Sequence, residues 1–361
     1  NVLEATEVDQ SQIAGDEIIQ KTETSFDRSV IPAIGPDPEI NIPEIWTGEL
    51  ENGIRIWGIK HDELPLVSYN LEIEGSHLLE DLDKSGTASL MAQLMNEGTA
   101  NKTPEELEEA IDLLGASIRI RATGEAIVIS VNTLSRNFEK TVDLVEEMLM
   151  EPRWDSTEFV LAKESVIQSF PRNRANPGYM ASLTLDKLMY GDNHLFSVPL
   201  SGTEETVPGI SLEDLKDFYN TSLSPSLTRF HIVGDIEKER VETALSSLEQ
   251  RWEKKDISLP EIEIPANPEK SKIYFVDFPG AKQSVIQIGN IAIPRSHPDY
   301  YPAYVVNYKL GGSFNGIVNL ILREEKGYTY GARTGFSGGS HTGSFSASSS
   351  VRTTATGESV Q

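Results

Sequence analysis

Hydrophobic and polar residues alternate along two early stretches of the chain, residues 53–59 and 66–74. Both stretches are rich in β-branched and aromatic residues, and a turn-forming cluster at residues 61–65 separates them. Such alternation predicts half-buried strands, and a short polar connection between two of them favours a hairpin. We therefore expect the chain to open its folded part with a hairpin between about Glu49 and Gly75.

Helical patterns follow this hairpin. Residues 86–97 are apolar and rich in methionine, which predicts a buried helix. Thr103-Pro-Glu-Glu106 has an N-cap residue, proline at the first helical position and glutamate at the third, so a helix is expected from there to Gly115. Periodicity further predicts strands at 117–122, 126–134 and 227–233, and helices at 138–150, 156–170, 178–189, 211–220 and 238–250.

The same pattern restarts after a proline-rich segment at residues 260–268. The restart predicts strands at 272–277, 283–289, 328–335 and 343–350, with a helix at 299–310. A weak internal repeat of this kind predicts an α+β fold made of two homologous units in tandem, each a mostly antiparallel sheet packed with helices. We assign residues 45–265 to the first unit and 270–361 to the second, which is shorter and which we expect to be incomplete.

Composition excludes several classes of function. The net charge of −25 over 361 residues argues against nucleic acid or an anionic membrane surface as partner. No apolar run is long enough for a transmembrane helix. The absence of cysteine excludes disulfides and thiolate metal sites, and fits a bacterial protein of the periplasm or cell envelope. Residues 1–44 are polar and proline-containing and predict an extended linker, so we expect the chain to be a segment of something longer.

The stretch from Leu310 to Ala332 carries the most distinctive chemistry. A glycine pair, Gly311-Gly312, precedes a helical pattern that ends at Gly327, and an aromatic strand start follows. Arg323 and Tyr330 stand on either side of that helix end. A guanidinium and a phenol brought together can donate hydrogen bonds to a peptide carbonyl, or to the oxyanion formed when water attacks it. Taken alone, the pair also fits an ordinary surface arginine and a strand tyrosine.

This stretch resembles the C-terminal-domain signature of the pitrilysin/insulinase zinc metallopeptidases, which include the mitochondrial processing peptidases. The resemblance runs from about Glu49 to the end of the chain. It implies that Arg323 and Tyr330 complete a proteolytic site from the domain opposite the metal. It also implies that Gly311 and Gly312 form a glycine-rich loop that lets backbone approach substrate closely.

The resemblance also locates the family's zinc motif, and shows it to be lost. The flanking Gly86-Thr87-Ala88 and Gly98-Thr99 are present. The positions of the family's two histidines, its general base, its third ligand and its supporting glutamate fall on Ser89, Gln93, Ala92, Ser169 and Ala162. Hydroxyl and neutral amide groups do not replace two imidazoles and a carboxylate as zinc ligands. We expect no metal and no other cofactor in this chain, with zinc carried by a partner.

Two further positions bear on binding. By the same resemblance, substrate adds as a strand to the edge at residues 116–122, which would make Ser117, Arg119 and Arg121 substrate-binding residues. The two arginines, however, are also residues of the kind that protect an exposed sheet edge. His77 and Glu80 have helical spacing, but the context of His77 favours a loop histidine over a metal ligand.

Two functions remain open at this point. One is the non-zinc half or subunit of a split peptidase, which binds peptide and lends Arg323 and Tyr330 to a site whose metal lies on a homologous subunit or an upstream half. On this view the chain alone does not hydrolyse peptides. The other is an inactive structural homologue that binds a partner protein, as scaffolds in respiratory complexes do. The intact Arg–Tyr pair favours the first.

Overall fold

The computed structural model describes residues 27, 30, 33, 35–36 and 39–361. Residues 43–361 form one compact unit. The described residues before it include no helix or strand. Most of the predicted linker at residues 1–44 lies outside the described residues.

The larger unit contains two sheets. The strands are β1 (Trp46–Glu49), β2 (Arg55–Lys60), β3 (Leu66–Glu74), β4 (Ser117–Ala122), β5 (Ala126–Leu134), β6 (Thr228–Gly234), β7 (Gln283–Ala292), β8 (Thr329–Gly338) and β9 (Gly343–Arg352). The α-helices are α1 (Thr87–Leu94), α2 (Pro104–Leu113), α3 (Phe138–Met150), α4 (Ser156–Arg174), α5 (Pro177–Tyr190), α6 (Leu212–Ser222), α7 (Lys238–Ala244), α8 (Ser246–Arg251), α9 (Tyr300–Asn307), α10 (Ile317–Asn319) and α11 (Thr356–Val360). We call residues 46–251 the first lobe and residues 283–360 the second lobe.

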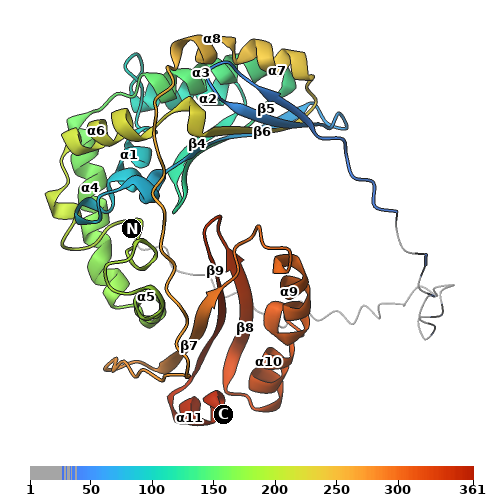
Figure 1. Cartoon of the computed structure of the whole chain (residues 1–361), viewed down its shortest axis with the longest axis vertical. Helices are drawn as coiled ribbons and strands as arrows, with labels where there is room; N and C mark the ends of the chain where they lie inside the picture. The colour runs from blue at the N-terminus through green and yellow to red at the C-terminus, as the bar shows by residue number, and fades with distance from the viewer. Residues whose placement is uncertain (1–26, 28–29, 31–32, 34, 37–38) are drawn as a thin grey trace, which may run out of the picture. The chain divides into compact units, whose positions relative to one another are not determined.

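The first lobe is built on a six-stranded sheet in the order β1-β2-β6-β3-β5-β4. All neighbouring strands run antiparallel except β2 and β6, which run parallel. Helices α2, α3, α7 and α8 lie along one face of this sheet (Figure 1). The predicted α+β class, with a mostly antiparallel sheet packed with helices, is confirmed.

The predicted hairpin of residues 49–75 is wrong in its pairing. Both strands form, but β6 lies between them: it pairs with β2 from Arg55↔Arg229 to Lys60↔Gly234, and with β3 from Val67↔Gly234 to Ile73↔Thr228. Alternation along a strand reports which side chains are buried, but not which strand lies next to it. The distant β6 therefore takes the place that the short connection suggested for β3.

The core of the first lobe forms where β3, β6 and α3 meet. The Tyr69 ring stacks on Phe230 with centroids 5.2 Å apart and meets the edge of Phe138 at 5.6 Å. All three side chains are almost fully buried. Because aromatic side chains bury large areas, this cluster fixes β6 against β3 and α3.

Local signals position most helix ends as expected. The capping box of α2 is present: Glu106 N–H donates to Thr103 Oγ1 at 3.2 Å, and Thr103 N–H donates to Glu106 Oε2 at 2.8 Å. Helix α1 begins after Gly86, whose φ of 107° favours glycine. The single helix predicted for residues 238–250 is instead two short helices, α7 and α8, which meet at Leu245.

His77 is a buried residue, and the loop-histidine prediction missed this. It lies in a short 3₁₀ turn, Ser76–Leu79, with 3% of its surface exposed. Its Nδ1 faces the buried Glu80 carboxylate, and its Nε2 faces the carbonyl oxygens of Leu195 and Val198 at 3.2 and 3.1 Å. Glu80 Oε1 in turn accepts from Ala88 N–H at 2.6 Å. Through these hydrogen bonds, His77 and Glu80 connect the start of α1 to the segment after α5.

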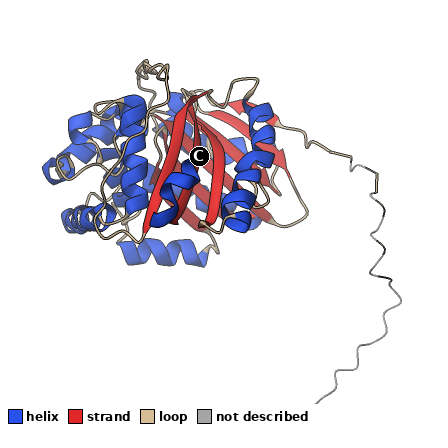
Figure 2. Ribbon diagram, turned by 90° about the horizontal axis from the view of Figure 1, so that it is seen from below, coloured by secondary structure: helices blue, strands red, loops and turns tan. Residues whose placement is uncertain are grey.

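The second lobe holds a three-stranded antiparallel sheet in the order β7-β9-β8. Helices α9 and α10 and the π-helical turns η8 (Tyr308–Gly312) and η9 (Leu320–Glu325) pack along β8 (Figures 1 and 2). The strand predicted at residues 272–277 does not form, and Ile273 and Phe275 are each 87% exposed. A strand needs a neighbour to bond with, and this segment has none among the described residues.

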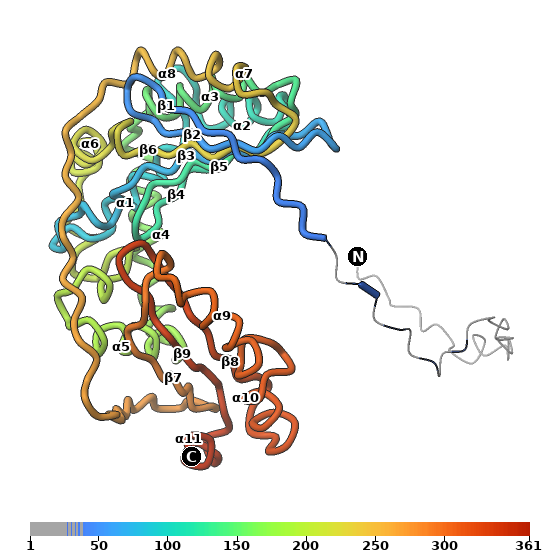
Figure 3. Tube along the Cα trace, turned by 45° about the vertical axis from the view of Figure 1, so that its right-hand side comes forward, coloured from blue at the N-terminus to red at the C-terminus, as the bar shows by residue number. Residues whose placement is uncertain are grey.

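The connection between the lobes, residues 252–282, runs past α6 to reach β7 (Figure 3). His194 Nε2 donates to Glu263 O at 3.0 Å, while its Nδ1 accepts from Phe196 N–H at 3.1 Å. Further on, the Asn267 side-chain amide bonds both main-chain groups of Ile291, at 2.8 and 2.9 Å. Near its start, Lys255 N–H also donates to Ser224 Oγ at 3.0 Å, so the connection is hydrogen-bonded to both lobes.

Helix α5 of the first lobe packs against β7 of the second. Gln287 Nε2 donates to Ser182 Oγ at 3.2 Å. A Cβ at Gly289 would lie 2.9 Å from Leu185 Cδ2, so the absence of a side chain there permits close contact. The same helix carries Asp186, a half-buried carboxylate with no hydrogen bond or ion pair among the described residues.

Asp186 predicts a pH dependence of stability. Burial raises the pKa of Asp186 from its ordinary 3.8 to about 6. The folded state thus keeps this proton to a higher pH than the unfolded chain, so the free energy of unfolding falls as pH rises from about 4 to about 6. Asp186→Asn, which removes the charge, should raise the melting temperature at pH 7 and leave it nearly unchanged at pH 4.

The matched control is Asp192→Asn, the same change at an exposed residue just beyond α5. It should leave the melting temperature unchanged at both pH values. An Asp186→Asn protein that melts like the parent at pH 7 would show that this carboxylate is adequately solvated in the fold.

Candidate functional site

Arg323 lies in η9, near the end of the helical part of the signature. Its guanidinium stands over the ring of Phe314, with 4.6 Å between the guanidinium carbon and the ring centroid. Its Nε also lies 3.3 Å from Glu324 Oε1, and about a third of the side chain is exposed. A cation over an aromatic face is attracted by the ring quadrupole, so Phe314 limits where the guanidinium points.

Tyr330 occupies an irregular point of β8. Pairing with β9 shifts between Thr329↔Val351 and Ala332↔Ser349, so β8 holds one extra residue there. This is a β-bulge, a feature that re-aims a side chain and disrupts the ladder locally. The Tyr330 side chain is 91% exposed, and its hydroxyl has no hydrogen-bond partner among the described residues.

Side-chain hydrogen bonds hold the bulge in place. Thr329 Oγ1 accepts from Gly331 N–H at 3.0 Å and lies 2.7 Å from Ser350 O. Asn319, which is 3% exposed, accepts from Ala332 N–H at 3.0 Å and donates to Phe314 O at 2.7 Å. Asn319 thus connects the loop under Arg323 to the bulge at Tyr330. Its only sequence signal was a polar residue inside an apolar helical pattern, and sequence reasoning missed it.

The structure links the segments that carry Arg323 and Tyr330 through Asn319, which supports both. The contacts of the described residues include no direct hydrogen bond between the two side chains. Both retain polar groups that the fold itself leaves largely unused. The arrangement can therefore donate hydrogen bonds outward to an anionic or carbonyl oxygen brought by another molecule.

The glycine pair has two different environments. Gly311 is buried, and a Cβ there would lie 2.6 Å from Thr334 Oγ1 and 2.8 Å from Thr334 N. Gly312 is exposed, with Asn307 as its nearest neighbour. Thr334 Oγ1 donates to Asn307 Oδ1 at 2.6 Å, and Asn307 Nδ2 donates to the main-chain oxygen of Thr334 at 3.0 Å. The backbone of Gly311 thus lies close to Thr334 of β8; the predicted close approach of both glycines to substrate stays a prediction.

The degenerate zinc positions lie on two neighbouring helices. Ser89, Ala92 and Gln93 are on α1, where Ala92 is buried and Gln93 exposed, and Ser169 is on α4. Ser169 Oγ is used within its own helix, where it donates to Val166 O at 2.7 Å. These donors do not fit Zn²⁺, which takes imidazole, thiolate or carboxylate ligands. Nowhere in the described part of the chain do three such residues gather to hold a metal.

The predicted peptide-binding strand is an edge strand. β4 is the last strand on one side of the first sheet and, among the described residues, pairs only with β5. Ser117, Arg119 and Arg121 are exposed and lie on one face of it, while Ile118 and Ile120 face the helices and are more buried. The free edge satisfies the geometric need of strand addition, and peptide binding there remains a prediction.

The hairpin tips of the two lobes meet. Both carboxylate oxygens of Glu125, from the β4–β5 connection, accept from Ser340 N–H in the β8–β9 connection, at 2.8 and 3.1 Å. A Cβ at Gly339 would lie 2.4 Å from Glu125 Oε1, so the glycine leaves room for the carboxylate. This contact joins the end of the β4 strand to the lobe that carries Arg323 and Tyr330.

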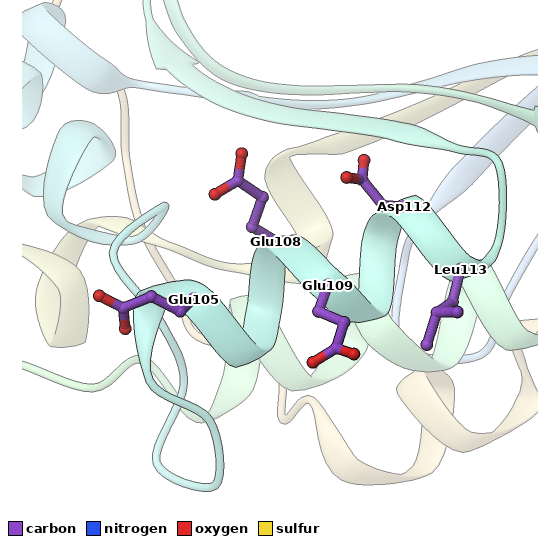
Figure 4. Close-up of a pocket in the computed structure, with 5 residues that line it drawn as sticks. All are labelled: Glu105, Glu108, Glu109, Asp112 and Leu113. Atoms are coloured by element: carbon purple, nitrogen blue, oxygen red, sulfur yellow. The ribbon is translucent and has the colours of Figure 1, made fainter.

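A shallow hollow on α2 is lined by Glu105, Glu108, Glu109, Asp112 and Leu113 (Figure 4). All five residues come from one helix. Glu108 and Asp112 lie on one side of the helix, and Glu109 and Leu113 on the other (Figure 4). The carboxylates do not converge as metal ligands do, and the surface is best described as a solvated acidic helix face.

The fold and two family models define a chain of the insulinase class. Residues 59–200 match the family described as Insulinase (Peptidase family M16), and residues 209–361 match the Peptidase M16 inactive domain. The chain belongs to the peptidase M16 family. The match to the inactive domain, and the similarity to an inactive M16 domain of known structure, support a catalytically inactive member.

Individual relatives share less than a quarter of their aligned residues with the chain. The chain is 22% identical over 283 residues to an uncharacterized zinc protease, YmxG, of Bacillus subtilis, covering 78% of this chain and 67% of that protein. It is 23% identical over 285 residues to a non-peptidase homolog, also YmxG, of Helicobacter pylori, covering 77% and 64%. The chain thus spans about two thirds of the length of these relatives.

Solved structures agree with this family. The inactive M16 domain of Pseudomonas fluorescens is similar with a TM-score of 0.79 and 27% identity, over 86% of this chain and 74% of that one. A protease from Helicobacter pylori gives a TM-score of 0.80 at 16% identity, over 89% and 79%, which shows likeness of fold. In the described residues no helix has the length and apolar character needed to cross a membrane.

The lost ligands predict the behaviour of the chain toward zinc. At equal concentrations of protein and zinc, the chain should bind less than ~0.1 equivalent, because Ser89, Gln93 and Ser169 offer no imidazole or carboxylate. Elemental analysis after purification without chelators measures this. A value near one equivalent would contradict the prediction, as would a four-coordinate ion beside these three residues.

The packing of Gly311 predicts a stability effect. Gly311→Ala should lower the free energy of unfolding by ~1–3 kcal/mol, because the new methyl group would overlap Thr334. The control is Gly335→Ala on β8, where a Cβ would meet nothing within 4 Å. Thermal melting of both variants decides the matter; equal melting temperatures would show that η8 moves away from β8 without cost.

Proposed function

We propose that this chain is the non-zinc half of a split M16 peptidase. It supplies Arg323 and Tyr330 to a proteolytic site whose metal lies on a homologous subunit or an upstream half. The observation that carries the proposal is the exposed Tyr330, which the fold aims outward by a supported bulge and which bonds no other described residue of its own chain. A β-bulge disrupts the hydrogen bonds of the ladder locally, which costs free energy. Such features are found mainly where the re-aimed side chain has a function, here contact with a partner.

Three observations support the proposal. The family match covers both the zinc-type domain and the inactive domain. By the family resemblance, Ser89, Gln93 and Ser169 stand at the metal-ligand positions, whereas Arg323 and Tyr330 are present. Some relatives carry an assembly in their names: the beta subunits of mitochondrial processing peptidase match at 21–22% identity. The term subunit describes those proteins, and a comparable pairing for this chain is part of the proposal.

The chemistry assigned to this chain is binding and charge stabilisation. Zinc on the partner would supply a polarised water for attack on the peptide carbonyl. Arg323 donates N–H groups, and Tyr330 donates its O–H, to the carbonyl oxygen as it gains negative charge. Phe314 and Asn319 keep the two donors oriented, so little reorganisation is needed as the charge develops. Peptide held along the free edge of β4 would be the substrate.

The alternative is a structural homologue that binds a partner protein and performs no catalysis. The non-peptidase name of the Helicobacter pylori relative favours this reading. Under it the exposed Tyr330 would be a contact residue of an interface, and its hydroxyl would have no catalytic part. The following measurement separates the two.

Mixing this chain with the zinc-bearing homologous subunit should give peptidase activity that neither protein has alone. Arg323→Ala or Tyr330→Phe should then lower turnover by ~10²-fold, the usual effect of removing one donor to a developing oxyanion. Turnover of a fluorogenic peptide mixture, with assembly checked by size-exclusion chromatography, provides the measurement.

Matched controls are Arg333→Ala and Tyr304→Phe, changes of the same kind at exposed residues of the second lobe. They should leave turnover unchanged. If all four variants assemble and are equally active, the pair has no catalytic part. If Arg323→Ala and Tyr330→Phe weaken assembly, with no change in the turnover of the fraction that does assemble, the structural alternative holds.

A further inference from the structure

The edge of β4 carries a side-chain contact at its centre. Asn96, in the turn after α1, donates from Nδ2 to Ile120 O at 2.9 Å, and its Oδ1 accepts from Ile120 N–H at 2.9 Å. The amide therefore bonds both main-chain groups of one strand residue, as the main chain of a neighbouring antiparallel strand does. Asn96 thus occupies the position that a peptide residue opposite Ile120 would take in strand addition.

The rest of this edge is open over the length of β4. Main-chain groups of alternate residues point the same way in an antiparallel pair, so those of Ile118 and Ala122 point away from β5, as those of Ile120 do. Neither Ile118 nor Ala122 has a partner for these groups among the described residues. Just before the strand, Ala116 N–H donates to a carbonyl oxygen of α2 at 3.2 Å. Asn96 therefore closes the middle of an edge whose two flanking residues are free.

The Asn96 side chain is also bonded to the end of α1. Its Nδ2 donates to Ala92 O at 2.7 Å and lies 3.4 Å from Gln93 O. An amide nitrogen has two N–H donors, so one serves the last turn of α1 and the other serves β4. The bond to Ala92 lies within the residue's own helical turn. The two bonds to Ile120 can therefore break without unfolding the helix.

The same arrangement occurs on the second sheet. The Asn267 amide bonds the N–H and C=O of Ile291, and Ile291 belongs to β7, an end strand of that sheet. In each lobe, an asparagine from outside the sheet thus bonds both main-chain groups of an isoleucine on an end strand. Unpaired edge groups readily take up another strand, and natural sheets protect them. The recurrence indicates that the contact of Asn96 with Ile120 protects an edge.

The side chains beside this contact indicate which peptide fits the edge. Arg119 and Arg121 are exposed, and neither side chain forms an ion pair or hydrogen bond among the described residues. Their cross-strand neighbours on β5, Ser130 and Val128, carry no charge. An added strand would place two of its alternate side chains beside the arginines, where opposite charges attract. The edge therefore favours an extended peptide with carboxylates at alternate positions.

We propose that Asn96 is an autoinhibitory gate on the edge of β4, displaced by an extended peptide that carries acidic residues at alternate positions. The proposal rests on the proposed function in one respect, namely that peptide binds along β4. On displacement, one peptide residue takes over both hydrogen bonds to Ile120, and the residues two positions away on either side bond Ile118 and Ala122. Because the bonds that Asn96 loses are replaced in kind, the gate lowers the affinity for peptide and does not prevent binding.

Fluorescence anisotropy of the chain with a labelled Asp-Val-Asp-Val-Asp-Val peptide tests the proposal. Asn96→Ala should lower the Kd by ~10-fold, because it removes the competitor for two hydrogen bonds. Asn96→Ser should do the same, since a serine hydroxyl still reaches the carbonyl four residues earlier in its helix but is too short to reach β4. The peptide Lys-Val-Lys-Val-Lys-Val should bind more weakly to the parent and to both variants.

The matched control is Asn70→Ala, the same change at an exposed residue of β3, inside the sheet. It should leave the Kd unchanged. If Asn96→Ala and Asn96→Ser lower the melting temperature but leave the Kd of the folded protein unchanged, Asn96 has a structural role only and the proposal is wrong. The assay needs neither zinc nor Arg323. A lower Kd for Asn96→Ala, beside unaffected turnover for Arg323→Ala, would therefore refute the catalytic role and leave the gate standing.

Amide hydrogen exchange locates the bound peptide. In the chain alone, Ile120 N–H should exchange at least ~10-fold more slowly than the N–H groups of Ile118 and Ala122, and Asn96→Ala should abolish this difference. A saturating amount of the Asp-Val peptide should protect all three groups. If the peptide binds but leaves Ile118 and Ala122 unprotected, it lies elsewhere and the proposal is wrong. Equal exchange of all three groups in the parent chain would also contradict it.

Discussion

The place of β6 between β2 and β3 is the constraint on which the first lobe depends. It supplies the one parallel pair of the sheet and an antiparallel pair on its other side. Its Phe230 also stacks on Tyr69, so the strand joins the sheet to the aromatic core. A parallel pair needs a long crossover, and here the crossover includes α1 to α6. Without β6, β2 and β3 would each lose a neighbour and the helices would have no continuous sheet to cover.

The sequence predicted what is determined locally. The capping box at Thr103 and Glu106, the alternation of β5 and the α+β class all follow from residues near each other in the chain. Three features depend on distant residues and could not be predicted. The partner of β2 is a strand far along the chain. The strand predicted at 272–277 does not form, since no neighbour pairs with it among the described residues. His77 is buried because Glu80 and two carbonyl oxygens after α5 surround it.

The candidate site shows the same division. The sequence was enough to single out Arg323 and Tyr330 as candidate site residues, since both stand in a recognisable stretch. Their roles in catalysis await test. Their support could not, because the bulge at Tyr330 arises from pairing with β9, and Asn319 is buried by packing on β8. The zinc positions show why the metal-free helix is stable. Small or neutral residues at Ser89, Ala92 and Ser169 leave no buried carboxylate that would need a cation.

The exposed segment Ile273–Val276 has a consequence for the life of the protein in the cell. Its four residues are β-branched or aromatic, carry no charge and are each more than half exposed. Segments of this kind are templates for intermolecular strand pairing, and chaperones and proteases act on chains that display exposed apolar surface. An uncharged apolar segment that the described fold leaves open makes aggregation a competitor of folding. The yield of native protein would then depend on how well this one segment is shielded from other chains.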